Sequence, residues 1–327
     1  MRNAWVRRFI VAGAAILSAI LTVHHARADA YPSKPVRLLV GAGAGSAPDI
    51  IARLVANRLS QVWNSSVYVE NRTGAAGSIV AETAATAPAD GYTLLFAPTA
   101  ILAINQFTQA KLKYNPETDF DPVVFIGDSA MLIAVNPKLP VNNIAELLSY
   151  VKAQPGPVDY ATPSFGGVAH LTGELLSQRT GIRLTHVTYS SSPEAFADVA
   201  RGDVGILIDG IPTLVPHVRA GALRAIAVTG RTRSSSLPDV PALVETYPGL
   251  IARGWFAIMV PHGTPAPIVD KLAKDIGAIV KEDAITKRLS DFGVDPLPLA
   301  EGELDEFIKA ERKMWGDTIV KAGIKPK

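Results

Sequence analysis

Short apolar runs that alternate with amphipathic helical patterns constrain the fold of this chain more than any other feature. Val36–Val40, Val67–Val69 and Thr93–Phe96 are strand candidates, and Ile50–Trp63 and Ile79–Ala87 have helical spacing between them. Strands separated by helices of this length need crossover connections, which make neighbouring strands parallel. The alternation therefore predicts an α/β chain with mainly parallel sheets flanked by helices.

The rest of the chain continues this alternation. Strand candidates lie, in order, at Leu132–Val135, Val158–Ala161, His186–Tyr189, Ile206–Asp209 and Ala225–Val228. Helical patterns separate the first four of them, and two amphipathic helices follow near the C-terminus, around residues 268–279 and 304–319. We expect the apolar stripes of these last two helices to pack on a core.

Two helix starts have a recognisable signature. In Ser46–Asp49 and Ser192–Glu194 a serine precedes a proline and then an acidic residue. This order matches a capping box, in which the serine side chain caps the first turn of the helix. We therefore expect Ser46 and Ser192 to cap their helices, and Gly202 to end the second one.

The N-terminal segment has the pattern of a secretory signal peptide. Three arginines precede an uncharged run from Phe9 to Val23, and Ala26 and Ala28 form a small-residue cleavage pattern. The run of 15 residues is shorter than the roughly 20 that span a bilayer, which favours a cleaved signal over a membrane anchor. We expect residues 1–28 to be removed before Asp29, and the remaining chain to be soluble in the periplasm.

Charge and cysteine content exclude several classes of function. The signal segment carries four of the 32 basic residues and no acid, so the mature chain has 28 basic against 30 acidic residues. Such a chain has no basic surplus for binding nucleic acid. Cysteine is absent, which excludes disulfides, thiol catalysis, cysteine metal sites and a lipoprotein anchor. The histidines show no metal-ligand spacing, so we expect neither a metal nor a cofactor.

A glycine-rich turn follows the first strand and opens the first helix. Glycine lets the backbone approach a ligand closely, and free amides at a helix N-terminus favour an anion. The candidate binding residues of this first loop are Ala42, Gly43, Ala44, Gly45, Ser46 and Asp49. A dinucleotide site is the alternative, but Ser46 stands where that fingerprint has Gly or Ala, and Glu70 lies 29 residues after Gly41 rather than about 20.

A second loop of the same kind follows the strand that ends near Thr162. Its candidate binding residues are Thr162, Ser164, Phe165, Gly166, Gly167 and His170. Ser164 and His170 could also be a hydrolase pair, but no G-x-S-x-G elbow surrounds the serine, and a packing or hydrogen-bonding histidine is favoured. Asp209 ends another apolar strand, where it either binds a donor group of a ligand or forms a turn.

Several segments together resemble the Bug-type receptors, the TctC-like substrate-binding proteins of tripartite tricarboxylate transporters. The resemblance covers the whole mature chain in order. It is carried by Tyr31–Val40, Asp49–Arg53, Val69–Ser78, Ala89–Leu95, Arg201–Val204, Leu223–Val228, Leu237–Pro241, Trp255 and Pro261–Pro265.

The resemblance implies a type II-like periplasmic binding protein fold, with two domains that close around one ligand. We expect domain 1 to comprise residues 29–128 plus 226–327, and domain 2 to comprise residues 129–225. Family members bind mostly small carboxylates, and the two loops would face each other across the cleft, with Thr99 in the first wall. Asp209 matches an acid found near the amino group of amino-acid ligands. Ala42 departs from the usual aromatic residue, which could enlarge the pocket.

These observations favour a binding protein over an enzyme. We expect a monomeric receptor that holds its ligand mainly through neutral donors, since neither loop contains Lys or Arg, and that docks transiently on membrane transporter subunits. An exported serine hydrolase using Ser164 or Ser46 is the enzymatic alternative. A ligand-presenting component of a sensor system is the third.

Overall fold

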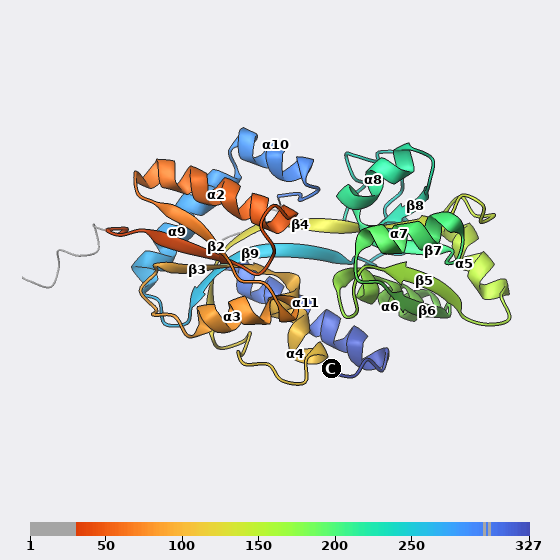
Figure 1. Ribbon diagram of the computed structural model, residues 1–327, viewed down its shortest axis with the longest axis horizontal. Coiled ribbons are helices and arrows are strands. Elements are labelled where there is room, and N and C mark those ends of the chain that lie inside the picture. The colour runs from red at the N-terminus through yellow and green to blue at the C-terminus, as the bar shows by residue number, and fades with distance from the viewer. Residues whose placement is uncertain (1–30, 297–298, 300–301) are drawn as a thin grey trace, which may run out of the picture.

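The computed structural model describes residues 31–296, 299 and 302–327. The segment predicted to be a signal peptide lies outside these residues. Figure 1 shows two lobes side by side, joined by two strands, β4 and β9, that run along the long axis of the molecule. The α/β architecture expected from the alternation is therefore present, and it is divided into two lobes.

The first lobe is built on parallel strands with antiparallel crossing strands beside them. β1 pairs in parallel with β2 and with β3, β9 pairs antiparallel with β3, and β4 pairs antiparallel with β9. Their bounds are β1 Val36–Val40, β2 Val67–Asn71, β3 Thr93–Pro98, β4 Phe120–Val135 and β9 Arg253–Pro261. Since β1 and β3 end at the same edge, the turns that follow them lie close together.

Helices cover both faces of this sheet. Apolar side chains of α2, α9 and α10 form one core with one face, while α3, α11 and the short η3 form a second core with the other. The two amphipathic C-terminal helices predicted from the sequence correspond to α9 and α11. The bounds are α2 Ala47–Trp63, η2 Ala75–Gly77, α3 Ser78–Ala85, η3 Ala100–Ile104, α4 Asn105–Thr108, α9 Ala266–Val280, α10 Asp283–Asp291 and α11 Glu303–Lys321.

The second lobe repeats this plan. β5 pairs in parallel with β6 and β7, and the end of β4 lies antiparallel between β7 and β8. One face carries α5 and α6, and the other carries α7 and α8. The bounds are α5 Ile144–Ala153, β5 Val158–Thr162, α6 Val168–Thr180, β6 Leu184–Thr188, α7 Ser192–Arg201, β7 Ile206–Gly210, α8 Ile211–Arg219, β8 Arg224–Val228 and η4 Leu243–Glu245.

The crossing strands were the least visible in the sequence. β4 pairs with β9 from Phe120 to Ala130 and with the second-lobe strands from Met131 to Val135. The sequence pattern predicted only its last four residues and no strand at β9. Two register shifts near Pro122 and Gly127 interrupt the regular alternation along the first part of β4.

The expected return of the chain to the first lobe lies between residues 225 and 226, and the packing of the following residues favours a later position. β8 pairs with β4 in the second lobe, and Leu243 and Leu250 pack in the core of that lobe. Trp255, on β9, belongs to a core of the first lobe. We therefore propose that the chain returns to the first lobe near Ala252.

Both helices begin near the predicted positions, but the predicted side-chain caps Ser46 and Ser192 do not cap them. Ser46 is the N-cap residue of α2, but its hydroxyl donates to the carbonyl of Gly43 at 2.6 Å instead of capping the helix. At α7 the cap is Ser191, one residue before Ser192, and its hydroxyl accepts from the amide of Glu194. Gly202 ends this helix in the left-handed conformation, as expected.

Candidate ligand-binding cleft

Asp49 holds the first loop against the start of α2. Its side chain is 1% exposed. One carboxylate oxygen accepts from the amide of Gly45 at 2.8 Å and from Nε of Arg53 at 3.0 Å, and the other accepts from Nδ2 of Asn71 at 2.8 Å. Burial alone would raise the pKa of Asp49, but these hydrogen bonds outweigh it and lower the pKa. Asp49 therefore shapes the loop, and its oxygens are already occupied.

A cavity of about 180 Å³ lies at the ends of β1 and β3. Its lining residues are mostly glycine, alanine and proline, which leave backbone within reach of a ligand. They are Val40, Gly41, Ala42, Pro48, Gly74, Ala76, Gly77, Phe96 and Pro98. Ala42 is the only residue of the predicted site among them. Gly43, Ala44 and Gly45 are exposed beside the cavity.

The turn Gly74–Gly77, to which no binding role was assigned from the sequence, also lines this cavity. Gly74 and Gly77 adopt positive φ angles of 121° and 86°, and Ala75 and Ala76 lie in the left-handed region. Asn71, just before the turn, donates to the carbonyl of Ala42 at 2.9 Å as well as to Asp49. The paired glycines of Gly74–Gly77 were the available signal, because such runs place backbone in conformations that other residues avoid.

Thr99, expected in the first wall, is not among the residues that line this cavity and bonds to the crossing strand β9. It is 2% exposed. Its hydroxyl accepts from the amide of Trp255 at 2.6 Å and donates to the carbonyl of the same residue at 3.2 Å. The hydroxyl thus joins the turn after β3 to β9, and a place for Thr99 in the ligand wall stays a prediction.

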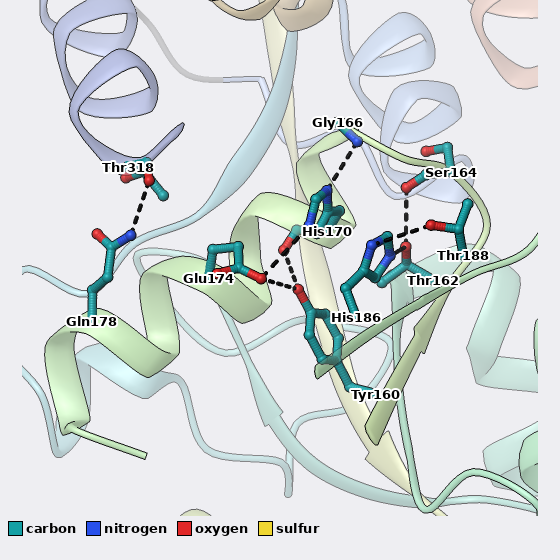
Figure 2. A network of polar contacts seen from close by, with 10 residues as sticks. All are labelled: Tyr160, Thr162, Ser164, Gly166, His170, Glu174, Gln178, His186, Thr188 and Thr318. Atoms are coloured by element: carbon teal, nitrogen blue, oxygen red, sulfur yellow. Dashed lines mark hydrogen bonds and ion pairs between the residues drawn. The ribbon is translucent and has the colours of Figure 1, made fainter. Parts of the chain in front are cut away.

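The second loop combines exposed and buried residues. Ser164 and Phe165 are exposed, Gly166 and Thr162 are buried, and Gly167 is the N-cap residue of α6. The hydroxyl of Thr162 donates to the carbonyl of Ser164 at 3.1 Å and lies 2.7 Å from Nε2 of His186. Figure 2 shows that the hydroxyl of Thr162 lies between these two partners. Thr162 therefore holds the loop through a buried hydrogen bond, while Ser164 and Phe165 are the residues of the loop that solvent can reach.

His170 joins this loop to α6. Its Nδ1 accepts a hydrogen bond from the amide of Gly166 at 2.9 Å, and its Nε2 lies 3.6 Å from Oε1 of Glu174. The two ring nitrogens therefore have partners other than Ser164, and no hydrogen bond joins Ser164 to His170 in the described part of the chain. This geometry agrees with the hydrogen-bonding role that the sequence favoured for His170, and it does not form a serine–histidine pair.

A buried polar network surrounds His170. The ring of His186 stacks on that of His170, with centroids 3.7 Å apart and planes 12° apart. The hydroxyl of Tyr160 lies 2.9 Å from both Glu174 Oε1 and the His170 carbonyl. Burial and, to a smaller extent, the neighbouring His170 lower the pKa of His186 to about 3. Burial raises the pKa of Glu174, but hydrogen bonds from His170 and Tyr160 outweigh it, so the pKa is lowered.

Asp209 presents a buried carboxylate at the end of β7. It is 8% exposed, and its Oδ1 accepts from the amide of Gly210 at 2.7 Å. Its Oδ2 is buried with no hydrogen-bond partner among the described residues. Burial raises the pKa of Asp209, an effect that the nearby Ser192 hydroxyl only partly offsets. The two readings of Asp209, ligand contact and turn former, are both compatible with this geometry.

The second loop reaches the first lobe at α4. A side chain at Gly166 would lie 3.3 Å from Cγ2 of Thr108. Lys327 donates its backbone amide to the carbonyl of Thr108, and its ammonium lies 3.8 Å from the centroid of the Phe165 ring. The residues lining the 180 Å³ cavity all belong to the first lobe, so the arrangement in which both loops face one ligand remains a prediction.

Other features of the described chain bear on alternative functions. Two larger cavities, of about 620 and 320 Å³, lie between α4 and α11 and beside Asp128 and Arg253, and none of the predicted binding residues lines either. The residues that the structure places contain no cluster of three or more potential metal ligands. Within the same residues, no helix is both long and apolar enough to cross a membrane.

Two lobes joined by crossing strands, with glycine-rich turns at their strand ends, define a two-domain periplasmic binding protein fold. A family model described as "Tripartite tricarboxylate transporter family receptor" (TctC) matches residues 51–324. The chain therefore belongs to the TctC family of tripartite tricarboxylate transporter receptors, as the sequence motifs indicated.

Individual proteins agree with this assignment. Protein BugT of Bordetella pertussis is 33% identical over 302 residues, which cover 92% of this chain and 93% of BugT. Rpa4515 of R. palustris, solved with adipate, is 34% identical with a TM-score of 0.78, over 91% of this chain and 100% of that one. MatC (Rpa3494) of Rhodopseudomonas palustris, solved with bound malate, is 28% identical with a TM-score of 0.72, over 88% and 100%.

Proposed function

We propose that this protein is an exported receptor that captures a small carboxylate between its lobes and delivers it to a tripartite tricarboxylate-type membrane transporter. The observation that carries the proposal is the cavity at the ends of β1 and β3, beside the N-terminus of α2 and walled by glycine and alanine backbone. The adipate of Rpa4515 and the malate of MatC support this class of ligand.

The first loop offers neutral donors to a carboxylate. The first amides of a helix have no partner within the helix, and the helix dipole favours an anion there. Each hydrogen bond to a charged group contributes about 1.5–3 kcal/mol, so a few of them reach the roughly 8 kcal/mol of micromolar binding. In the second wall, Lys327 adds a cation beside Phe165 that the loop sequences do not contain.

The chain length of the ligand is set by the small residue at position 42. Ala42 and Gly74–Gly77 leave the cavity open where a larger side chain would narrow it. We therefore propose that the ligand is a dicarboxylate at least as long as adipate, whose far end reaches the second loop. A donor group on the ligand would satisfy Oδ2 of Asp209, which is buried without a partner among the described residues.

The remaining parts of the proposal concern location and partners. We propose that residues 1–28 direct export to the periplasm, that the receptor acts there as a monomer, and that docking on the transporter subunits is transient. Binding without turnover is the proposed activity, supported by the ring nitrogens of His170, which face Gly166 and Glu174 and not Ser164.

A binding screen tests this function. The chain would be produced with its own leader, purified from the periplasm and measured by thermal shift and calorimetry against adipate, malate, acidic amino acids and aromatic acids. Binding should raise the melting temperature in a saturable way. The absence of binding to every carboxylate, or the hydrolysis of an ester control that Ser164→Ala abolishes, would refute the proposal.

A further inference from the structure

A hydrogen bond to the imidazole ring of His170 joins the second loop to α6. The amide of Gly166 donates to Nδ1 of His170 at 2.9 Å, and Gly166 has a positive φ of 71°. This bond is buried, and Gly166 lies between the exposed Phe165 and the half-buried Gly167 of the candidate site. The conformation of the loop therefore depends on an unprotonated nitrogen at Nδ1.

The surroundings of His170 determine how it can gain a proton. Glu174 lies beside Nε2 at 3.6 Å and can balance a positive ring. His186 stacks on the other face of the ring, and burial and the neighbouring ring keep it neutral. Tyr160 donates toward Glu174, and the ammonium of Lys327 lies beyond Phe165. Among the described residues, these are the titratable side chains that act on the charges of Glu174 and His186.

We propose that His170 is a positioning residue that holds the loop 164–167 only while its ring is neutral, so that the receptor releases this loop as the pH falls. The consequence for the ligand rests on the proposed function, in which this loop closes over a carboxylate. Imidazole is the side chain whose charge ordinarily changes between about pH 8 and pH 5.

Protonation would convert the acceptor into a donor. In the imidazolium ion both ring nitrogens carry hydrogen, so Nδ1–H would face the amide hydrogen of Gly166. The loss of that bond frees Gly166 and the exposed residues beside it. Since one hydrogen bond contributes about 0.5–1.5 kcal/mol, ligand affinity should fall by roughly three- to tenfold between pH 8 and pH 5.

The first arm of the test needs no ligand. NMR of the ¹⁵N-labelled protein from about pH 8 to pH 5 would follow the amide of Gly166 and the ring nitrogens of His170. Wild type should show an Nε2–H tautomer at high pH, and the Gly166 signal should move with the His170 titration. His170→Asn keeps an acceptor at the δ position without a proton to gain, and should hold the Gly166 signal constant.

Two control variants distinguish a pH-dependent bond between His170 and Gly166 from a purely structural role of His170. His170→Leu removes the acceptor and should leave Gly166 unbonded at every pH. His217→Asn changes a histidine that stacks on Phe196 away from this loop, and should leave the Gly166 titration as in wild type. A Gly166 signal that titrates equally in wild type and His170→Asn would overturn the proposal.

The second arm uses adipate as the probe, by calorimetry at both ends of the same pH range. Wild-type affinity should fall by roughly three- to tenfold more at low pH than that of His170→Asn, in which only the protonation of adipate itself weakens binding. Equal pH dependence in both proteins would refute the link to binding. If adipate binds at no pH, the ligand assignment fails, while the Gly166 titration still decides the role of His170.

Discussion

The carboxylate of Asp49 accepts a hydrogen bond from the backbone amide of Gly45, four residues earlier in the chain, at 2.8 Å. This contact turns the first loop back onto the start of α2. Asn71, from the end of β2, ties the same carboxylate to the carbonyl of Ala42. One buried side chain thus determines how the glycine-rich backbone is presented to the cavity.

Replacing Asp49 by asparagine should destabilise the protein by about 1.5–3 kcal/mol, because its charge-assisted hydrogen bonds are lost or weakened. Urea unfolding at neutral pH measures this change. Asp317→Asn is the matched control, since Asp317 forms an exposed pair with Lys313 and should change stability by less than about 1 kcal/mol. Equal losses in both variants would contradict the role given to Asp49.

The stability of the protein should also depend on the charge of Asp49 in acid. Its folded-state pKa lies below the ordinary value of 3.8, so its contribution is present above that value and is lost as the pH falls through the folded-state pKa. The unfolding free energy measured from about pH 6 to pH 2 should therefore fall less steeply in Asp49→Asn than in wild type. Parallel curves for the two proteins would show that Asp49 does not carry this dependence.

Removing the Thr99 hydroxyl should weaken the joint between β3 and β9. Thr99→Val leaves the buried amide of Trp255 without its acceptor, which should cost about 1–3 kcal/mol. Thr99→Ser keeps the hydroxyl and should retain most of the stability. The denaturant midpoints of the two variants are compared at equal m-values. A larger loss in Thr99→Val shows that the hydrogen bond stabilises the protein, and a larger loss in Thr99→Ser shows that the packing of the methyl group does.

The ion pair between Asp128 and Arg253 lies on the crossing strands, and the arginine is 3% exposed. Arg253→Met would leave a buried carboxylate unpaired, and should destabilise the protein by about 3–5 kcal/mol. The double variant Asp128→Leu with Arg253→Met should recover much of this loss, because no charge stays buried. A double-mutant cycle on unfolding free energies tests this; purely additive losses would indicate that the two residues do not interact.

Filling the cavity at position 42 should discriminate between ligands. Ala42→Phe would occupy part of the 180 Å³ space and should weaken adipate binding by about tenfold, since each methylene kept out of the cavity costs about 0.8 kcal/mol. Malate, which has a shorter chain, should be affected less. Ala44→Phe places the same ring on an exposed position of the loop and controls for the added side chain. Equal losses for both acids would argue against this cavity as the ligand site.

The sequence by itself determined the local elements of this protein. The apolar runs predicted β1, β3 and β7, and the glycine-rich turn before Asp49 predicted the start of α2 and the position of the first loop. These predictions succeed because strand and helix periodicity, and the conformational freedom of glycine, are properties of neighbouring residues. The capping bond of Ser46 was wrong in detail because a competing acceptor, the carbonyl of Gly43, lies equally close in sequence.

Only the tertiary structure decided which residues support the site. The bond between Thr99 and Trp255 joins residues 156 positions apart, and the stacking of His170 on His186 depends on the pairing of β5 with β6. Neither contact has a periodic signal in the sequence, because strand pairing is set by the packing of the whole sheet. The apolar run Trp255–Val260 was an available signal for the crossing strand β9, but its pairing with both β3 and β4 is visible only in the folded chain.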